Sequence, residues 1–191
     1  MALGRKYNEN TIFRDLLAEL MELVVTLSVG EFIPQLSWDM FIGGTDTTST
    51  LLEWAMSELM KHPRVMKKLQ GGANLQKLEY LKLVIKETIR LHPPVPLLPP
   101  RQLMQDPTIM GYDVSAGTMI LTNAWGIARG PADWGESPDE FQSERLQTKV
   151  DFRGQHFQLI SFGAGRRCCP GISFGLAVVE VALANLVRDF D

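Results

Sequence analysis

Cysteine is scarce in this 191-residue chain, which contains only Cys168 and Cys169, next to each other in the sequence. An ordinary disulfide needs Cα atoms ~4.4–6.8 Å apart and converging Cβ vectors, which neighbouring residues do not easily provide. The sequence therefore lacks a disulfide framework, as is typical of a reducing compartment. An excess of positive charge is also missing. Nineteen Lys and Arg residues against 22 Asp and Glu give a net charge of −3, which argues against a strongly basic nucleic-acid binder.

The sequence also lacks a long uninterrupted apolar segment. Its first residues, MALGRKYNENT, do not contain the apolar core of a signal peptide. The most apolar early stretch, 16–36, includes three acidic residues, a glycine and a proline. It falls short of the ~18 apolar residues that a membrane span needs. We therefore expect no membrane anchor in the chain as written.

The composition is that of an ordinary folded protein. Hydrophobic residues make up 45% and charged residues 21%, and these values exclude a chain that is disordered throughout. Hydrophobic periodicity predicts a mainly α fold with a small β component, in one domain over 1–191. The β region is expected at 95–122, as an extended segment and then a hairpin that pairs 108–110 with 118–122. The other expected segments are an early helical segment at 1–36 with a helix at 11–28, helices at 37–61, 64–70, 75–91 and 123–129, a meander at 130–162, a loop at 162–171 and a final helix at 171–190.

The loop from Ser161 to Gly171 is rich in glycine, carries two arginines and leads into the last helix. Guanidinium charge, a helix N-terminus and open backbone N–H groups favour the thiolate form of a cysteine, which is the form that binds metals. Four interpretations remain: a buried structural cysteine, a zinc site, a phosphate loop or a single-thiolate iron ligand. Zinc is disfavoured because the three histidines show no ligand spacing, and a phosphate loop because the Lys-Ser/Thr ending is absent. A single thiolate accounts for the glycines, the arginines and the cysteine together.

Two further segments give only weak evidence of function when each is taken alone. Glu87 and Arg90 stand three residues apart on a predicted helix, where a solvated surface pair is the ordinary interpretation. The segment GGTDTT at 43–48 is a poor helix interior, because glycine costs ~1 kcal/mol and hydroxyl groups compete for backbone bonds. By itself it indicates no more than a close helix crossing.

Together, the three segments resemble the cytochrome P-450 (haem-thiolate monooxygenase) family, specifically its plant microsomal branch of specialised metabolism. The stretches FIGGTDTTSTLLEWAMSELMKHPRVMKK, YLKLVIKETIRLHPPVPLLPPRQ and FGAGRRCCPGISFGLAVVE look like that branch nearly residue for residue. The family's haem-loop pattern F-x-x-G-x-R-x-C-x-G falls on Phe162, Gly165, Arg167, Cys169 and Gly171. The resemblance implies a cytochrome P-450 fold and places Cys168 at a variable position.

On the proximal side, the resemblance implies that the Cys169 thiolate is the ligand of haem iron and favours O–O cleavage. Phe162 would pack against this haem face, while Gly165 and Gly171 let the backbone wrap the sulfur. The haem propionates would be approached by Arg101, Arg167 and His92.

On the distal side, the resemblance implies that Gly43 and Gly44 let the oxygen-activation helix run close to the porphyrin. Asp46 and Thr47 would act as the acid–alcohol pair that manages protons for bound dioxygen. A threonine hydroxyl that competes with the backbone ladder is expected to open the helix at this point.

The resemblance also has implications for a buried structural network and for the reaction. Glu87 and Arg90 would form a buried structural network with Arg145, since a buried charge is tolerated only when it is paired. The cofactor would be haem (iron protoporphyrin IX), and NADPH would act only through NADPH–cytochrome P-450 reductase. The enzyme would insert one oxygen atom from O₂ into an apolar organic substrate at the cytosolic face of the endoplasmic reticulum membrane. A dehydratase or isomerase of the same family, or a non-catalytic remnant, remains an alternative.

The sequence departs from the family pattern in several places. The family's Pro-Glu-Arg-Phe is Ser143-Glu144-Arg145-Leu146, and a longer acidic linker is reduced to GGAN before Leu75. The early segment joins directly to Asp39, although the family has two further helices between them. We therefore expect an incomplete cytochrome P-450 fold, from a truncated and internally deleted chain that is a poor or inactive enzyme.

Overall fold

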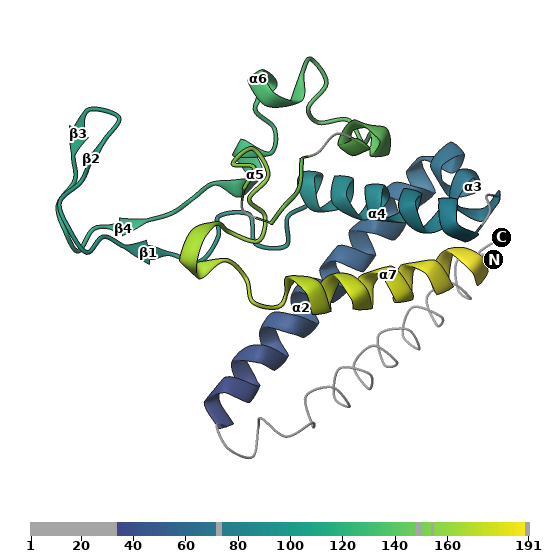
Figure 1. Ribbon diagram of the computed structural model, residues 1–191, viewed down its shortest axis with the longest axis horizontal. Helices are drawn as coiled ribbons and strands as arrows, with labels where there is room; N and C mark the ends of the chain where they lie inside the picture. Colours follow the sequence, from purple (N-terminus) through teal and green to yellow (C-terminus); the bar gives the residue numbers. More distant parts are fainter. Residues whose placement is uncertain (1–33, 72–73, 148–149, 154, 190–191) are drawn as a thin grey trace, which may run out of the picture.

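The computed structural model describes residues 34–71, 74–147, 150–153 and 155–189 (Figure 1). The helix expected at 11–28 lies outside the described residues. The described elements are α2 (Pro34–Lys61), α3 (Pro63–Gly71), α4 (Asn74–Leu91), β1 (Arg101–Gln102), β2 (Thr108–Ile109), β3 (Tyr112–Asp113), β4 (Met119–Ile120), α5 (Ala124–Ile127), α6 (Pro131–Trp134), η1 (Ser143–Gln147), η2 (Gly165–Arg167) and α7 (Ile172–Asp189). The expectation of a mainly α fold with a small β component is confirmed.

The long helices α2, α4 and α7 meet in one apolar core. The helix α2 packs against both α4 and α7, and α4 also contacts α7 and η1 (Figure 1). Leucine and β-branched residues at helical spacing fill the contact, and Leu52, Leu59, Val84, Ile89 and Leu183 are almost completely buried. This packing fixes the glycine-containing half of α2 relative to α7, the helix that follows the cysteine loop.

The junction between α2 and α3 is set by its sequence. The His62 N–H donates to the Glu58 carbonyl at 3.0 Å, which closes the last turn of α2. Pro63 then begins α3, where its missing N–H costs nothing because the first turn of a helix leaves that group unpaired. The chain therefore turns sharply here, and α3 packs on α4 and α7.

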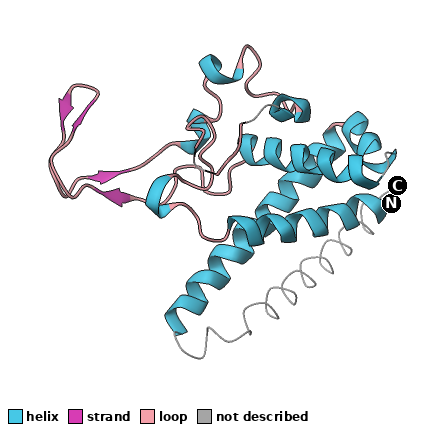
Figure 2. Cartoon of the chain, in the orientation of Figure 1, coloured by secondary structure: helices cyan, strands magenta, loops and turns pink. Residues whose placement is uncertain are grey.

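The strand pairing differs from the hairpin predicted for 108–110 and 118–122, and that prediction is wrong. The strand β2 pairs with β3, whereas β4 pairs with β1, with Arg101 opposite Ile120. The physical reason is a two-residue turn at Met110 and Gly111, whose φ angles of 50° and 86° suit the tight hairpins of right-twisted strands. The strands extend away from the helices (Figure 2).

The meander from 130 to 162 shows no sustained hydrophobic period, yet it contributes to the core. Trp134, Phe141, Leu146 and Phe152 are each buried among the helices. Isolated large side chains therefore anchor this irregular segment. None of the helices in the described part of the chain combines the length and apolarity needed to cross a membrane.

Candidate functional site

The cysteine loop connects the meander to α7 through two bends that require glycine. Gly163 and Gly165 have φ angles of 75° and 72°, in the left-handed region that side chains with a Cβ rarely adopt. The loop is closed by a hydrogen bond from the Cys169 N–H to the Phe162 carbonyl at 2.9 Å and by another from the Cys168 N–H to the Gly165 carbonyl at 3.1 Å. These bonds hold the backbone around the two cysteines in a defined shape.

The structure gives the two cysteines different surroundings. Cys169 is exposed, and a Cβ built on Gly171 would lie 3.8 Å from its sulfur, so Gly171 leaves room beside it. Cys168 is half-buried, with its Sγ 3.7 Å from the Gly163 carbonyl oxygen. Since α7 begins at Ile172, Cys169 lies just before the N-terminus of a long helix. Cys169 is therefore the cysteine available to a ligand outside the loop.

Two arginines lie at the cysteine loop. Arg101 reaches back from β1, where its Nη2 lies 3.5 Å from the Ala164 carbonyl oxygen. Arg167 belongs to the loop itself and is exposed. The structure thus brings Arg101, at the start of β1, to the cysteine loop across a sequence separation of 63 residues. Two guanidinium groups at one site suit a ligand that carries carboxylates.

Phe162 connects the loop to the core. Its ring meets Phe152 in an edge-to-face arrangement, with 5.2 Å between ring centroids. It is half-buried against the main apolar cluster. One part of the ring is thus fixed by packing while another part stays accessible beside the loop.

The second part of the candidate site is the GGTDTT segment of α2. Thr47 Oγ1 donates a hydrogen bond to the Gly43 carbonyl at 2.5 Å, and Asp46 is exposed. The expectation that this hydroxyl opens the helix is not met, because α2 continues without interruption from Pro34 to Lys61. The side-chain bond reaches one turn back along the helix and is accommodated without a break.

The described part of the chain leaves the space beside these glycines open. A Cβ built on Gly43 or Gly44 would meet no heavy atom of the described residues within 4 Å. Large apolar side chains are exposed on the elements around the site, including Leu97 at 47% and Phe174 at 48%. An exposed thiol, two arginines, apolar side chains and an unfilled helix face fit a flat apolar cofactor with two carboxylates, which is the chemistry of haem. Within the described chain, no group of three or more His, Cys, Asp or Glu residues could hold a metal ion.

Glu87 and Arg90 are fully buried, and the structure brings Arg145 to them. Arg90 donates from Nε and Nη2 to the two Glu87 carboxylate oxygens at 2.9 and 2.8 Å. Arg145 Nε lies 3.6 Å from Glu87 Oε1. Arg90 also donates through Nη1 to the carbonyls of Ala128 and Pro138 at 2.8 and 2.7 Å. This network connects α4 to the meander that leads to the cysteine loop.

A second polar cluster was not predicted from the sequence. The buried Glu58 carboxylate lies 3.1 Å from His92 Nε2 and 3.2 Å from Lys61 Nζ, and the His92 ring stacks on Trp54 with 3.9 Å between centroids. Burial lowers the pKa of His92, while its hydrogen bond with Glu58 opposes that shift. The propionate contact that the resemblance implies for His92 therefore competes with Glu58. An acidic residue on the apolar face of α2 was the available sequence signal.

Comparison with known proteins agrees with this geometry. The family model for cytochrome P450 matches residues 6–191. A cytochrome P450 71A14 of Arabidopsis thaliana is 50% identical over 168 residues, which cover 80% of this chain and 34% of the relative. A norfluorocurarine oxidase of a Strychnos species is 51% identical over 167 residues, with 80% and 32% covered. A 3-beta-hydroxylase of Tanacetum parthenium is 39% identical over 277 residues, with 100% and 55% covered.

The chain therefore belongs to the cytochrome P450 family, whose cofactor is haem, and its matches lie in the plant branch of that family. It spans about half the length of the curated relatives that match it throughout. The 277 positions matched in the Tanacetum protein exceed the 191 residues of this chain by 86, so the relative carries segments that have no counterpart here.

Proposed function

We propose that the chain represents a haem-dependent monooxygenase that uses O₂ and reducing equivalents from NADPH, delivered by a reductase, to oxidise an apolar plant metabolite. The observation that carries this proposal is the exposed Cys169 before α7, in a loop that is bent at two glycines and contacted by Arg101 at Ala164. Haem held by a thiolate supplies the capacity to cleave the O–O bond. The residues of the chain supply binding, orientation and proton handling.

The proximal residues hold the cofactor in this proposal. Cys169 Sγ would hold the haem iron, and the accessible part of the Phe162 ring would lie beside the cofactor while Phe152 packs on the other part. Arg101 and Arg167 pair with the propionates, because guanidinium groups bind carboxylates with two parallel hydrogen bonds. The positive φ angle of Gly165 lets the backbone bend in this loop, and Gly171 places no Cβ beside the sulfur.

The distal residues handle protons. Gly43 and Gly44 carry no side chain toward the open space, so a cofactor can approach the helix backbone there. The Thr47 hydroxyl, now bonded to the Gly43 carbonyl, orders a proton donor for the reacting oxygen, and Asp46 at the surface of α2 exchanges that proton with solvent. Glu87, Arg90 and Arg145 have a structural role, because they hold the meander on α4.

The names of the relatives support oxidation as the type of reaction. One is called a hydroxylase and another an oxidase, and neither name describes a dehydratase or an isomerase. By analogy, we place the protein at the cytosolic face of the endoplasmic reticulum membrane, with a flavoprotein reductase docking near the cysteine loop. The substrate would be an apolar small molecule, since the side chains exposed around the site are apolar.

A second candidate is a non-catalytic remnant that binds haem weakly or not at all. The 86 positions of the Tanacetum relative without a counterpart favour it, as do the exposed apolar side chains. Haem needs cover on both faces, and a monooxygenase must exclude water from the reacting oxygen. Both candidates share the cysteine loop, so the same experiment separates them.

The test is to express residues 1–191, add haemin and record the carbon monoxide difference spectrum after reduction. We expect Cys168→Ser to retain the red-shifted Soret band of a thiolate complex and Cys169→Ser to lose it. Product formation with reductase, NADPH and a panel of apolar substrates then distinguishes the enzyme from the remnant. A thiolate band that survives Cys169→Ser and disappears in Cys168→Ser would reject the assignment of the ligand.

A further inference from the structure

A basic surface surrounds α3, in a chain whose net charge is negative. Residues 61–78 contain five Lys or Arg residues and one His, and no Asp or Glu. Lys61, Arg64, Lys67 and Lys68 lie at the end of α2 and along α3, and we call them the α3 basic surface. All four side chains are exposed. On α3, Lys67 and Lys68 follow Arg64 by three and four residues, so both are its neighbours on the helix surface.

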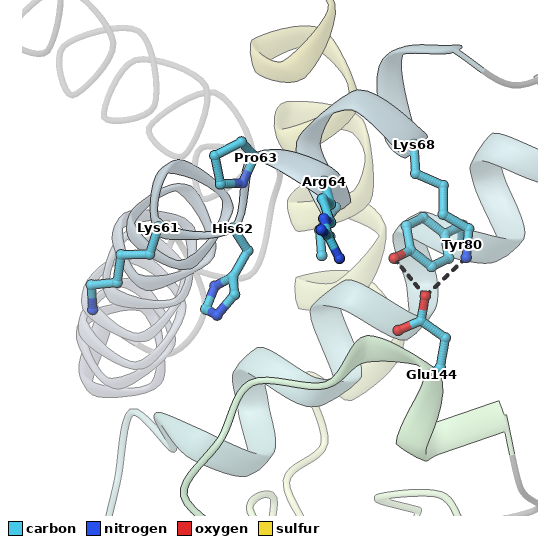
Figure 3. A pocket seen from close by; sticks show the side chains of 8 residues that line it. Lys61, His62, Pro63, Arg64, Lys68, Tyr80 and Glu144 are labelled. Atoms are coloured by element: carbon cyan, nitrogen blue, oxygen red, sulfur yellow. Dashed lines mark hydrogen bonds and ion pairs between the residues drawn. The ribbon is translucent and has the colours of Figure 1, made fainter.

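The α3 basic surface borders a cavity of about 430 Å³. Figure 3 shows Arg64 on one side of this cavity, with Lys68, Tyr80 and Glu144 on the other. Val65 and the nearly buried Tyr80 supply apolar lining. The cavity therefore combines a cationic rim with an apolar floor.

The cations on the rim differ in how far they are neutralised. Lys68 Nζ lies 2.9 Å from Glu144 Oε1 and 3.9 Å from the Tyr80 ring centroid, and Lys61 pairs with Glu58 at 3.2 Å. Arg64 and Lys67 make no hydrogen bond or ion pair with any residue that the structure describes. Two positive charges are thus available to a partner, and a third becomes available when Glu144 is displaced.

This surface is separate from the cysteine loop. Gln70 at the end of α3 donates through Nε2 to the Val187 carbonyl at 3.3 Å, which places α3 at the C-terminal end of α7. The cysteine loop precedes Ile172, at the opposite end of the same 18-residue helix. A helix of that length spans about 27 Å at 1.5 Å per residue. A partner at α3 therefore need not touch the haem-binding residues.

We propose that the α3 basic surface and its cavity bind an acidic, extended protein segment, with carboxylates on Arg64 and Lys67 and an apolar side chain in the cavity against Tyr80. Charge complementarity selects an anionic partner. The recessed apolar floor favours a segment of protein over a lipid surface, because a flat layer of head groups does not reach Tyr80. This inference does not depend on the proposed oxidation chemistry.

The probe is a fluorescein-labelled peptide, EEDFDEE, with QQNFNQQ as its neutral counterpart and vesicles containing phosphatidylserine as the alternative ligand. Fluorescence anisotropy at pH 7 should show binding of the acidic peptide only. The double variant R64Q/K67Q should weaken binding of the acidic peptide at least tenfold. The control Lys82→Gln, which removes one positive charge on α4, should change this binding less than twofold. Glu144→Gln should strengthen binding several-fold, since it releases Lys68.

The increase expected from Glu144→Gln separates the proposal from a folding defect, because a variant that has lost structure does not gain affinity. Circular dichroism of each variant establishes its helical content. Equal binding by R64Q/K67Q and the unchanged chain would overturn the proposal, as would equal binding of the neutral peptide. Vesicle binding without peptide binding would identify a lipid surface and overturn it. Absence of a helical circular-dichroism signal from the unsubstituted chain would also overturn the proposal, because the cavity requires α3 packed on α4.

Discussion

Arg90 holds the Glu87 carboxylate with two hydrogen bonds of 2.9 and 2.8 Å, and both side chains are completely buried. The same guanidinium also donates to the meander carbonyls of Pro138 and Glu140, and its Cζ lies 4.9 Å from the Trp134 ring centroid. The pair thus satisfies its own charges and fixes a segment that has little regular structure. The cysteine loop follows that segment, so its position depends on this internal salt bridge.

Removing one partner of this pair should be strongly destabilising. We expect Glu87→Gln to lower the free energy of unfolding by about 3–5 kcal/mol, because it leaves the Arg90 charge buried without a counterion. Urea unfolding followed by circular dichroism measures the change. The control is Glu79→Gln, whose carboxylate is 72% exposed beside Lys82 and should change stability by less than about 1 kcal/mol. Equal effects of the two substitutions would contradict the structural role.

Gly44→Ala should separate stability from cofactor binding. Gly44 lies inside α2, where an added Cβ meets no heavy atom of the described residues within 4 Å. Alanine should therefore stabilise the haem-free chain by about 0.5–1 kcal/mol, the usual helix preference over glycine. Haem titration should nevertheless show weaker binding, because the methyl group occupies the space reserved for the cofactor. Unchanged haem affinity would contradict the close approach proposed for this glycine.

Gly163→Ala should have the opposite effect on stability. Its φ angle of 75° is unfavourable for alanine, and the added Cβ would lie 3.6 Å from Arg101 Nη2. We expect the free energy of unfolding to fall by about 1–2 kcal/mol from the backbone conformation alone. Thermal unfolding of the haem-free chain measures this loss. A neutral effect would show that the loop adopts a different backbone conformation.

Thr47→Ala tests the distal residues and rests on the proposed function. The variant should keep haem and substrate binding but release more hydrogen peroxide for each NADPH consumed, because the hydroxyl no longer orders proton delivery. The control is Ser49→Ala, which removes a similar hydroxyl bonded to the Asp46 carbonyl at 3.1 Å. Because Ser49 lies two residues after Thr47 on the helix, its side chain is on a different face. Unchanged coupling in Thr47→Ala would count against the role.

Glu144 should make stability depend on pH in the acidic range. Desolvation raises the pKa of Glu144, but hydrogen bonds from Lys68, its own backbone, Ser143 and Tyr80 outweigh it and lower the pKa from 4.5 to about 2. A carboxyl group with a depressed folded-state pKa stabilises the fold above pH 4.5, and this stabilisation is lost as the pH falls toward 2. Urea midpoints between pH 5 and pH 2.5 should therefore fall more steeply in the unchanged chain than in Glu144→Gln. Parallel profiles would exclude this contribution, which solvent screening keeps modest because half of the side chain is exposed.

The sequence by itself determined the long helices and the identity of the cysteine loop. The predicted helices at 37–61, 75–91 and 171–190 agree within a few residues with α2, α4 and α7. These features are local: a helix is specified by apolar spacing and by Pro or Gly at its ends, all within a few turns of the chain. The haem-loop pattern is similarly contained in ten residues, from Phe162 to Gly171.

Only the tertiary structure decided which distant segments meet. The strand β4 pairs with β1 instead of β2, because the Met110–Gly111 turn pairs β2 with β3 and leaves residues 119–120 for the earlier strand. The contact of Glu58 with His92, 34 residues away, and the cavity between α3 and Glu144 have no periodic signal either. Charged and polar side chains choose partners by three-dimensional proximity and burial, which a pattern of hydrophobic spacing does not encode.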